Sequence, residues 1–155
     1  MALAERPTEP WRSIDWQKLW LTVRSSPWRS LALVPAGSGA PRDFTLRVAV
    51  WLARTGMMHL GIPIRVADAT QVPLTQMMQL NEEVSSYTSS GDLVLIALPA
   101  ASESAITTSI AQGSDCALLC VLLEKMATAD AKKTIRQIGT RKFIGSVLFH
   151  PTEKL

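Results

Sequence analysis

Short runs of consecutive apolar residues alternate along this chain with longer segments in which apolar residues recur at helical spacing. The clearest run is Leu93–Leu98, which follows Gly91 and Asp92 and stops before Pro99. Continuous runs of this length are typical of strands buried on both faces, as in a parallel sheet covered by helices. The alternation predicts a doubly wound α/β domain, with a mainly parallel five-stranded sheet, helices on both faces and an N-terminal helix. The predicted strands span 31–34, 62–67, 93–98, 116–122 and 143–149, and the predicted helices span 13–25, 43–60, 72–87, 104–112 and 127–138.

The chain divides into three parts. Residues 1–12 are rich in Pro, Glu and Arg and are predicted to be a flexible lead-in. Residues 13–29 form a Trp-rich helical segment with Ser13 as its N-cap, and residues 30–155 form the α/β domain. The length of 155 residues suits one domain, and 47% apolar with 19% charged residues is typical of a globular protein with a core. The methionines predicted to pack its helices are Met57, Met58, Met77 and Met78.

Charge and cysteine usage narrow the functional classes. The net charge is +3, but the basic residues are spread along the chain, so nucleic-acid binding is not predicted. The N-terminus lacks the apolar core of a secretory signal, and no apolar stretch approaches the roughly 18 residues that span a bilayer. Cys116 and Cys120 lie about 13 Å apart on one face of a predicted strand, so they cannot form a disulfide. These features predict a cytoplasmic protein with free, buried thiols, and placement at the inner face of the membrane is an alternative.

The carboxyl ends of parallel strands line the ligand crevice of open α/β sheets, and two candidate residues stand there. Ala97, near the end of the third predicted strand, cannot bind a metal, transfer a proton or act as a nucleophile. Asp68 follows the second strand, where it is either a catalytic carboxylate or, more simply, a helix N-cap or solvated turn residue. His59 and His150 are isolated and no Cys-x-x-Cys motif is present, so no metal site is predicted.

Partial motifs follow one another in order along the chain. The first strand runs into Val34-Pro-Ala-Gly-Ser-Gly-Ala-Pro41, the second ends in Val66-Ala-Asp68, and the third is part of Gly91–Ala100. Two further partial motifs begin at Asp115 and at Ile144. This series, over residues 31–150, resembles the deviant Walker P-loop ATPases, which comprise the ParA/MinD group and its bacterial tyrosine-kinase relatives of polysaccharide export. The resemblance implies these positions of a degenerate nucleotide site: Gly37, Ser38, Gly39, Arg42, Thr45, Asp68 and Ala97.

The chain departs from that family where the family performs its chemistry. A P-loop needs a Lys, backbone N–H groups that face the phosphates and a Ser or Thr hydroxyl that binds Mg²⁺. The resemblance places Thr45 near the position of that hydroxyl, but this loop lacks the Lys and contains Pro35 and Pro41. Asp43 adds negative charge beside a polyphosphate, Ala97 replaces the carboxylate that organises the metal, and His150 replaces a frequent Asn. The resemblance therefore implies a pseudo-ATPase without a cofactor. It would act as a scaffold or regulatory interaction protein in polysaccharide export, or in positioning a cell-surface or division machine.

Two other functional classes stay open. A nucleotide-binding sensor or weak ATPase would use the crevice at Gly37–Arg42 together with Asp68. A receiver-like or flavodoxin-like module would also be built from five βα units, but a receiver needs a phosphorylatable Asp where Ala97 stands.

The N-terminal segment is the candidate interaction surface, because it interleaves tryptophans with cations and both are enriched at binding hot spots. Its helix packs on its own domain, contacts a protein partner or a second copy, or lies on an anionic membrane surface. Asp15-Trp-Gln-Lys18 is similar to the acidic-x-x-basic helix through which the tyrosine-kinase relatives assemble. The predicted partners are therefore a homo-oligomer or an active homologous ATPase. The candidate residues are Trp11, Trp16, Lys18, Trp20, Arg24 and Trp28.

Overall fold

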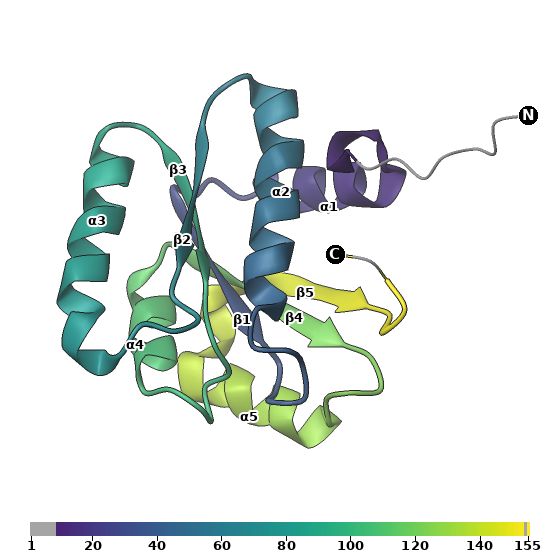
Figure 1. The fold of residues 1–155 in the computed structure, drawn as a ribbon, viewed down its shortest axis with the longest axis vertical. Coiled ribbons are helices and arrows are strands. Elements are labelled where there is room, and N and C mark those ends of the chain that lie inside the picture. The colour runs from purple at the N-terminus through teal and green to yellow at the C-terminus, as the bar shows by residue number, and fades with distance from the viewer. Residues whose placement is uncertain (1–8, 154) are drawn as a thin grey trace, which may run out of the picture.

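Five apolar segments form one parallel sheet in the computed structural model, which describes residues 9–153 and 155 (Figure 1). The strand order is β2-β3-β1-β4-β5, and every neighbouring pair is parallel. This confirms the predicted α/β fold with its N-terminal helix. The strands are β1 (Ser30–Pro35), β2 (Ile64–Asp68), β3 (Leu93–Ala97), β4 (Cys116–Leu122) and β5 (Phe143–Phe149).

The helices cover both faces of the sheet. Helices α1 and α2 lie on one face, and α3, α4 and α5 lie on the other (Figure 1). The helical elements are η1 (Pro10–Arg12), α1 (Ile14–Arg24), α2 (Phe44–Leu60), η2 (Leu74–Gln76), α3 (Met77–Ser89), α4 (Ile106–Gly113), α5 (Thr128–Ile138) and η3 (Thr140–Lys142).

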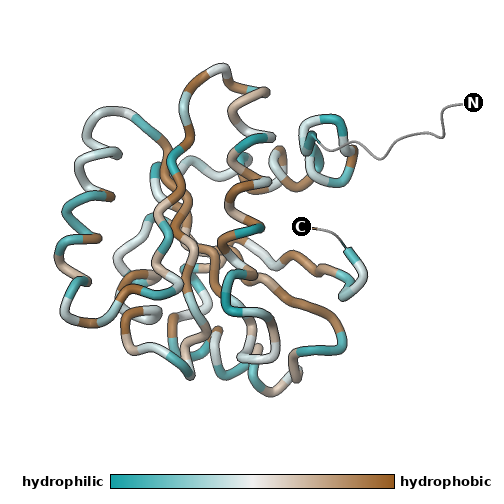
Figure 2. The backbone as a smooth tube through the Cα atoms, viewed as in Figure 1, coloured by the Kyte–Doolittle hydropathy of each residue, from teal (hydrophilic) through white to brown (hydrophobic). Residues whose placement is uncertain are grey.

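Each face of the sheet has its own core, because successive strand residues point to opposite faces. On the α1/α2 face, Leu33 and Leu95 pack with the aromatic rings of Trp20 and Phe44. On the other face, Ile96 packs with small and branched side chains from α4. Figure 2 shows hydrophobic segments gathered along the strands in the middle of the molecule.

The strand order separates this fold from the flavodoxin-like alternative. Receivers and flavodoxins place their strands in the order 2-1-3-4-5, with the first strand beside the second. Here β3 lies between β2 and β1, with Asp68 opposite Ala97 and Ala97 opposite Leu33. The receiver-like or flavodoxin-like reading is therefore wrong.

Several predicted boundaries shift for local reasons. Gly61 ends α2 in the left-handed conformation, where its N–H donates to the Met57 carbonyl over 2.8 Å, and β2 starts only at Ile64. The segment after Pro73 begins as the short η2 turn before it becomes α3. Ser13 occupies the N-cap of α1 without a capping hydrogen bond from its side chain.

The described residues also qualify two predictions about the surface. Most of the predicted lead-in, residues 1–8, lies outside the described residues, whereas Pro10–Arg12 forms η1 with Pro10 buried. Met58 and Met78 are exposed rather than packed, because they lie on the outer sides of α2 and α3. Among the described helices, none combines the length and apolar character needed to cross a bilayer.

Candidate functional site

The carboxyl end of β1 is the natural place for a ligand in this fold. The chain leaves β1 toward α2 on one face, while it leaves β3 and β4 toward α4 and α5 on the other face. Such a divergence of neighbouring connections is the topological switch point at which open α/β sheets bind ligands. The loop that carries Gly37, Ser38, Gly39 and Arg42 lies at this point.

The Thr45 hydroxyl, which the resemblance assigns to a bound metal, is used inside the protein. Thr45 is buried, and its Oγ1 donates a hydrogen bond to the Leu98 carbonyl over 2.7 Å. The Asp43 carboxylate is also engaged, since Arg47 donates to it from the next turn of α2 over 2.8 Å. Arg42 stays exposed beside them.

The glycines of the loop allow close packing against the segment that leads into α5. A Cβ on Gly39 would lie 1.6 Å from the Lys125 carbonyl oxygen, and a Cβ on Gly37 would lie 3.2 Å from the Asp130 Cβ. The Ala36 N–H donates to the Cys120 carbonyl over 2.9 Å. The loop is therefore seated on its own domain instead of encircling an open phosphate site.

The cavity inside this loop is correspondingly small. Between the loop, the first turn of α2 and Pro99, the free volume is about 20 Å³. A single water needs roughly 10–15 Å³ of this kind of volume, so the crevice at Gly37–Arg42 has room for about one water.

The two candidate residues at the strand ends lie side by side but face different surroundings, since Asp68 lines a cavity of about 250 Å³ together with Gln79 and Glu83 of α3. Asp68 and Ala97 are partners in the β2–β3 register. Ala97 is fully buried in the core of the α1/α2 face. The Asp68 Oδ1 accepts hydrogen bonds from the Thr70 N–H over 3.0 Å and from the Thr70 hydroxyl over 2.6 Å. Asp68 thus forms a turn, as its simpler interpretation predicted.

A more spacious polar cavity lies on the α5 side of the same loop. Its volume is about 180 Å³, and it brings Gly37 and Ser38 together with residues that the sequence analysis did not single out. Their spacing in the sequence could have pointed to this cavity, because Asp130, Lys133 and Gln137 recur on one face of a helix. The spacing does not show which other element that face contacts. The remaining lining residues are Ala101, Ser102 and Thr134.

The N-terminal tryptophans divide into buried and partly exposed groups. Trp20 and Trp28 are buried in the core. The Trp20 Nε1–H donates to the His59 Nδ1 over 3.1 Å, and the Trp28 Nε1–H donates to the Val23 carbonyl over 2.8 Å. Arg24 lies over the Trp28 ring, 5.1 Å from its centroid. The structure therefore removes Trp20 and Trp28 from the candidate interaction surface, because internal packing has covered them.

Trp16, Trp11 and Lys18 stay closer to solvent. Trp16 is half-buried and stacks on Trp51 of α2 with 6.0 Å between the ring centroids. Lys18 is exposed. Trp11 lines a groove of about 350 Å³ between η1, α1 and α2, in which the partly exposed rim includes Leu21 and Met58.

The two thiols are structural. Cys116 and Cys120 are free and buried, as predicted. Burial raises the pKa of the Cys116 thiol to about 11, and the neighbouring Asp115 carboxylate raises it in the same direction. Burial also raises the pKa of Cys120. Both therefore remain neutral thiols at neutral pH, which is unfavourable for a nucleophile.

Across residues 9–153 and 155, no three His, Cys, Asp or Glu side chains come together as a metal-binding group. Comparisons with protein-family models, curated proteins and solved structures find no match to this chain.

Proposed function

We propose that this protein is a non-catalytic interaction protein, with a degenerate P-loop-like domain that serves as a scaffold and acts through protein contacts. The observation that carries the proposal is the hydrogen bond from the buried Thr45 hydroxyl to the Leu98 carbonyl, because it uses internally the group that the resemblance assigns to a metal. The partner classes are a second copy of the chain and an active homologous ATPase. Polysaccharide export and the positioning of a surface or division machine remain the processes that the resemblance suggests.

The packing of the loop supports the same proposal. Gly39 is held against the Lys125 backbone, and the space inside the loop is about 20 Å³. Small-molecule sites usually enclose roughly 300–1,000 Å³. Binding a triphosphate at Gly37–Arg42 would require the loop to leave α5 and break its contacts there.

Exposed apolar side chains on the α1/α2 side of the sheet support a role in protein–protein contacts. Leu21 is 55% exposed and Met58 is 58% exposed, at the rim of the groove that Trp11 lines. Exposed apolar side chains that share the rim of one groove are a feature of interaction sites. Methionine adds adaptability to such a surface.

The alternative function is a sensor of a small polar ligand or nucleotide, and one observation favours it. The cavity of about 180 Å³ on the α5 side is lined by Lys133, Ser38 and Ser102, together with the acidic Asp130. A cation and hydroxyl groups around a cavity suit a phosphate-bearing ligand.

Calorimetric titration with ATP, with and without Mg²⁺, tests the proposal, together with measurement of phosphate release. We expect no saturable heat and no release. Micromolar ATP binding with turnover would overturn the proposal. Binding without turnover would favour the sensor, and Lys133→Ala should then weaken it while the exposed neighbour variant Lys132→Ala leaves it unchanged.

A further inference from the structure

We propose that the β5 edge of this protein pairs with β5 of a second copy, antiparallel and across a two-fold axis, to join two sheets into one. The inference rests on the proposed function in one respect, since it names a second copy as the partner. The pairing is centred on Ser146.

The backbone of β5 presents unused hydrogen-bonding groups on its outer side. Within the described residues, β5 pairs with β4 alone, and it forms one end of the sheet. The Phe149 carbonyl accepts a hydrogen bond from the Leu123 N–H over 2.8 Å, so the polar groups of Phe149 face inward. The polar backbone groups of successive strand residues point to alternate sides. Leu148 and Ser146 lie one and three positions before Phe149, so their N–H and C=O groups face outward.

The sequence of β5 is close to a palindrome about Ser146. Reading outward from that residue, Gly145 mirrors Val147, Ile144 mirrors Leu148, and Phe143 mirrors Phe149. An antiparallel pair with a two-fold axis at Ser146 places each residue opposite its mirror position. Because Ile144 is the extra residue of a bulge, the regular part of the pair would place Ser146 opposite Ser146 of the partner subunit and Val147 opposite Gly145 of the partner subunit.

β5 carries no charged side chain that would prevent another strand from pairing with it. The residues of β5 include none of Asp, Glu, Lys or Arg and no Pro. Natural proteins protect exposed edge strands with charges, prolines, bulges or covering elements. The bulge here lies between the partners of Ala117 and Leu118, near the start of β5, and leaves the stretch from Ser146 onward regular.

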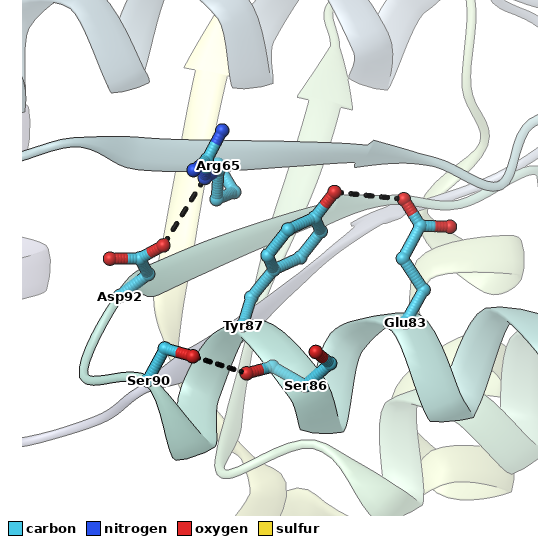
Figure 3. A network of polar contacts seen from close by, with 6 residues as sticks. All are labelled: Arg65, Glu83, Ser86, Tyr87, Ser90 and Asp92. Carbon is cyan, nitrogen blue, oxygen red and sulfur yellow. Dashed lines mark hydrogen bonds and ion pairs between the residues drawn. The ribbon is translucent and has the colours of Figure 1, made fainter.

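The opposite edge of the sheet shows the protection that β5 lacks. On β2, the exposed Arg65 pairs with Asp92 over 3.2 Å, and its guanidinium lies 5.0 Å from the centroid of the Tyr87 ring (Figure 3). The Tyr87 hydroxyl in turn donates to Glu83 of α3 over 3.2 Å (Figure 3). Arg65 gives β2 a charged side chain of the kind that protects edge strands, and Asp68 adds a second, whereas β5 has none, so the structure favours β5.

Apolar surface beside β5 would enlarge the contact beyond the backbone pairing. Leu148 is 59% exposed, and Ile14 in the first turn of α1 is 66% exposed. This turn lies beside β5, since Asp15 and Trp16 line a cavity of about 130 Å³ together with Leu148. A stable interface usually needs more than roughly 1,000 Å² in total, and the first turns of both α1 helices would contribute to it.

Cysteine cross-linking tests the register. In a hydrogen-bonded antiparallel pair, opposite Cα atoms are about 5.5 Å apart, which is within the range that a disulfide spans. Ser146→Cys should therefore give a disulfide-linked dimer under mild oxidation. The matched control is Leu148→Cys, because two copies of residue 148 would be about 13 Å apart along the strands. The native thiols should not compete, since both are buried.

Sedimentation velocity over a concentration series tests the pairing without cysteine. The unmodified chain should approach twice the mass of one chain as concentration rises. Ser146→Lys should stay monomeric, because it places like charges opposite each other on the axis, while Ser85→Lys on the exposed side of α3 should behave like the parent. Thermal melts show that each variant is folded.

A chain that stays monomeric at every concentration would overturn the inference, as would cross-linking of Leu148→Cys as fast as that of Ser146→Cys. Either result leaves the proposed function standing, because that proposal fails on nucleotide turnover. Conversely, turnover by a dimeric protein would overturn the proposed function and leave the β5 pairing in place.

Discussion

At the carboxyl end of the sheet, the Thr45 hydroxyl and the Ala36 N–H are bonded within the chain, whereas at the β5 edge the N–H groups of Ser146 and Leu148 face outward. The first region is where α/β sheets usually bind ligands, and the second is where sheets usually avoid contact. Under the two proposals above, these usual roles of the two regions are exchanged. Polar groups that are satisfied internally hold a scaffold together, and those left free are available for a partner.

The largest expected effect is at Gly39, where the carboxyl-end loop meets the backbone of Lys125. Gly39→Ala should lower the free energy of unfolding by about 3 kcal/mol, since the new Cβ would lie 1.6 Å from a carbonyl oxygen and the backbone must move. Urea denaturation measures this change. Gly113→Ala is the matched control, because a Cβ there meets nothing within 4 Å. Equal stability of the Gly39 variant and the parent would show that the loop is free to open.

Thr45 should give the next largest effect. Thr45→Val keeps the shape but leaves the buried Leu98 carbonyl without its donor, which should lower the free energy of unfolding by about 2 kcal/mol. Thr45→Ser keeps the hydroxyl and should cost about 1 kcal/mol through the lost methyl group. If Thr45→Val matched or exceeded the stability of Thr45→Ser in urea denaturation, the hydrogen bond would not be what holds this end of the sheet.

The buried thiol of Cys116, inside the sheet, should make the free energy of unfolding fall at alkaline pH. The pKa of Cys116 is about 11 in the folded chain, above its ordinary value of 9.0, because burial disfavours the thiolate. Its contribution is therefore fully present below pH 9.0 and is lost as the pH rises toward about 11. Cys116→Ala should flatten the alkaline decline in urea denaturation. A decline of the same slope in both proteins would contradict the assignment to Cys116.

The sequence predicted the fold well where local signals agree with the final contacts. The bounds of β4 and β5 match the predicted ones, because Asp115 precedes the first apolar run and Lys142 and His150 flank the second. The start of β2 was wrong by two residues, since Gly61 and Pro63 delay the strand after α2 ends. Local patterning thus fixes the existence of elements better than their ends.

The candidate site was less predictable, because it depends on contacts between distant segments. Nothing near Gly39 in the sequence indicates that Lys125 will lie against it. The amphipathic pattern around Trp20 predicts a buried face, but it does not say whether the domain or a partner covers that face. Likewise, the near-palindrome around Ser146 is visible in the sequence, yet its meaning depends on the strand order that leaves β5 at an edge.

The smallest expected change is confined to two amides of β5, and it compares inner and outer backbone groups within one strand. The N–H of Val147 faces β4 and should exchange slowly with deuterium at any protein concentration, because it belongs to the sheet. The N–H groups of Ser146 and Leu148 should exchange fast in dilute solution and slow at high concentration, when a second copy satisfies them. Hydrogen exchange followed residue by residue by NMR measures all three. Ser146→Lys is the control, because in this variant the outer N–H of Leu148 should exchange fast at both protein concentrations. Fast exchange of the outer amides in the parent chain at high concentration would mean that water, and no second copy, occupies the β5 edge.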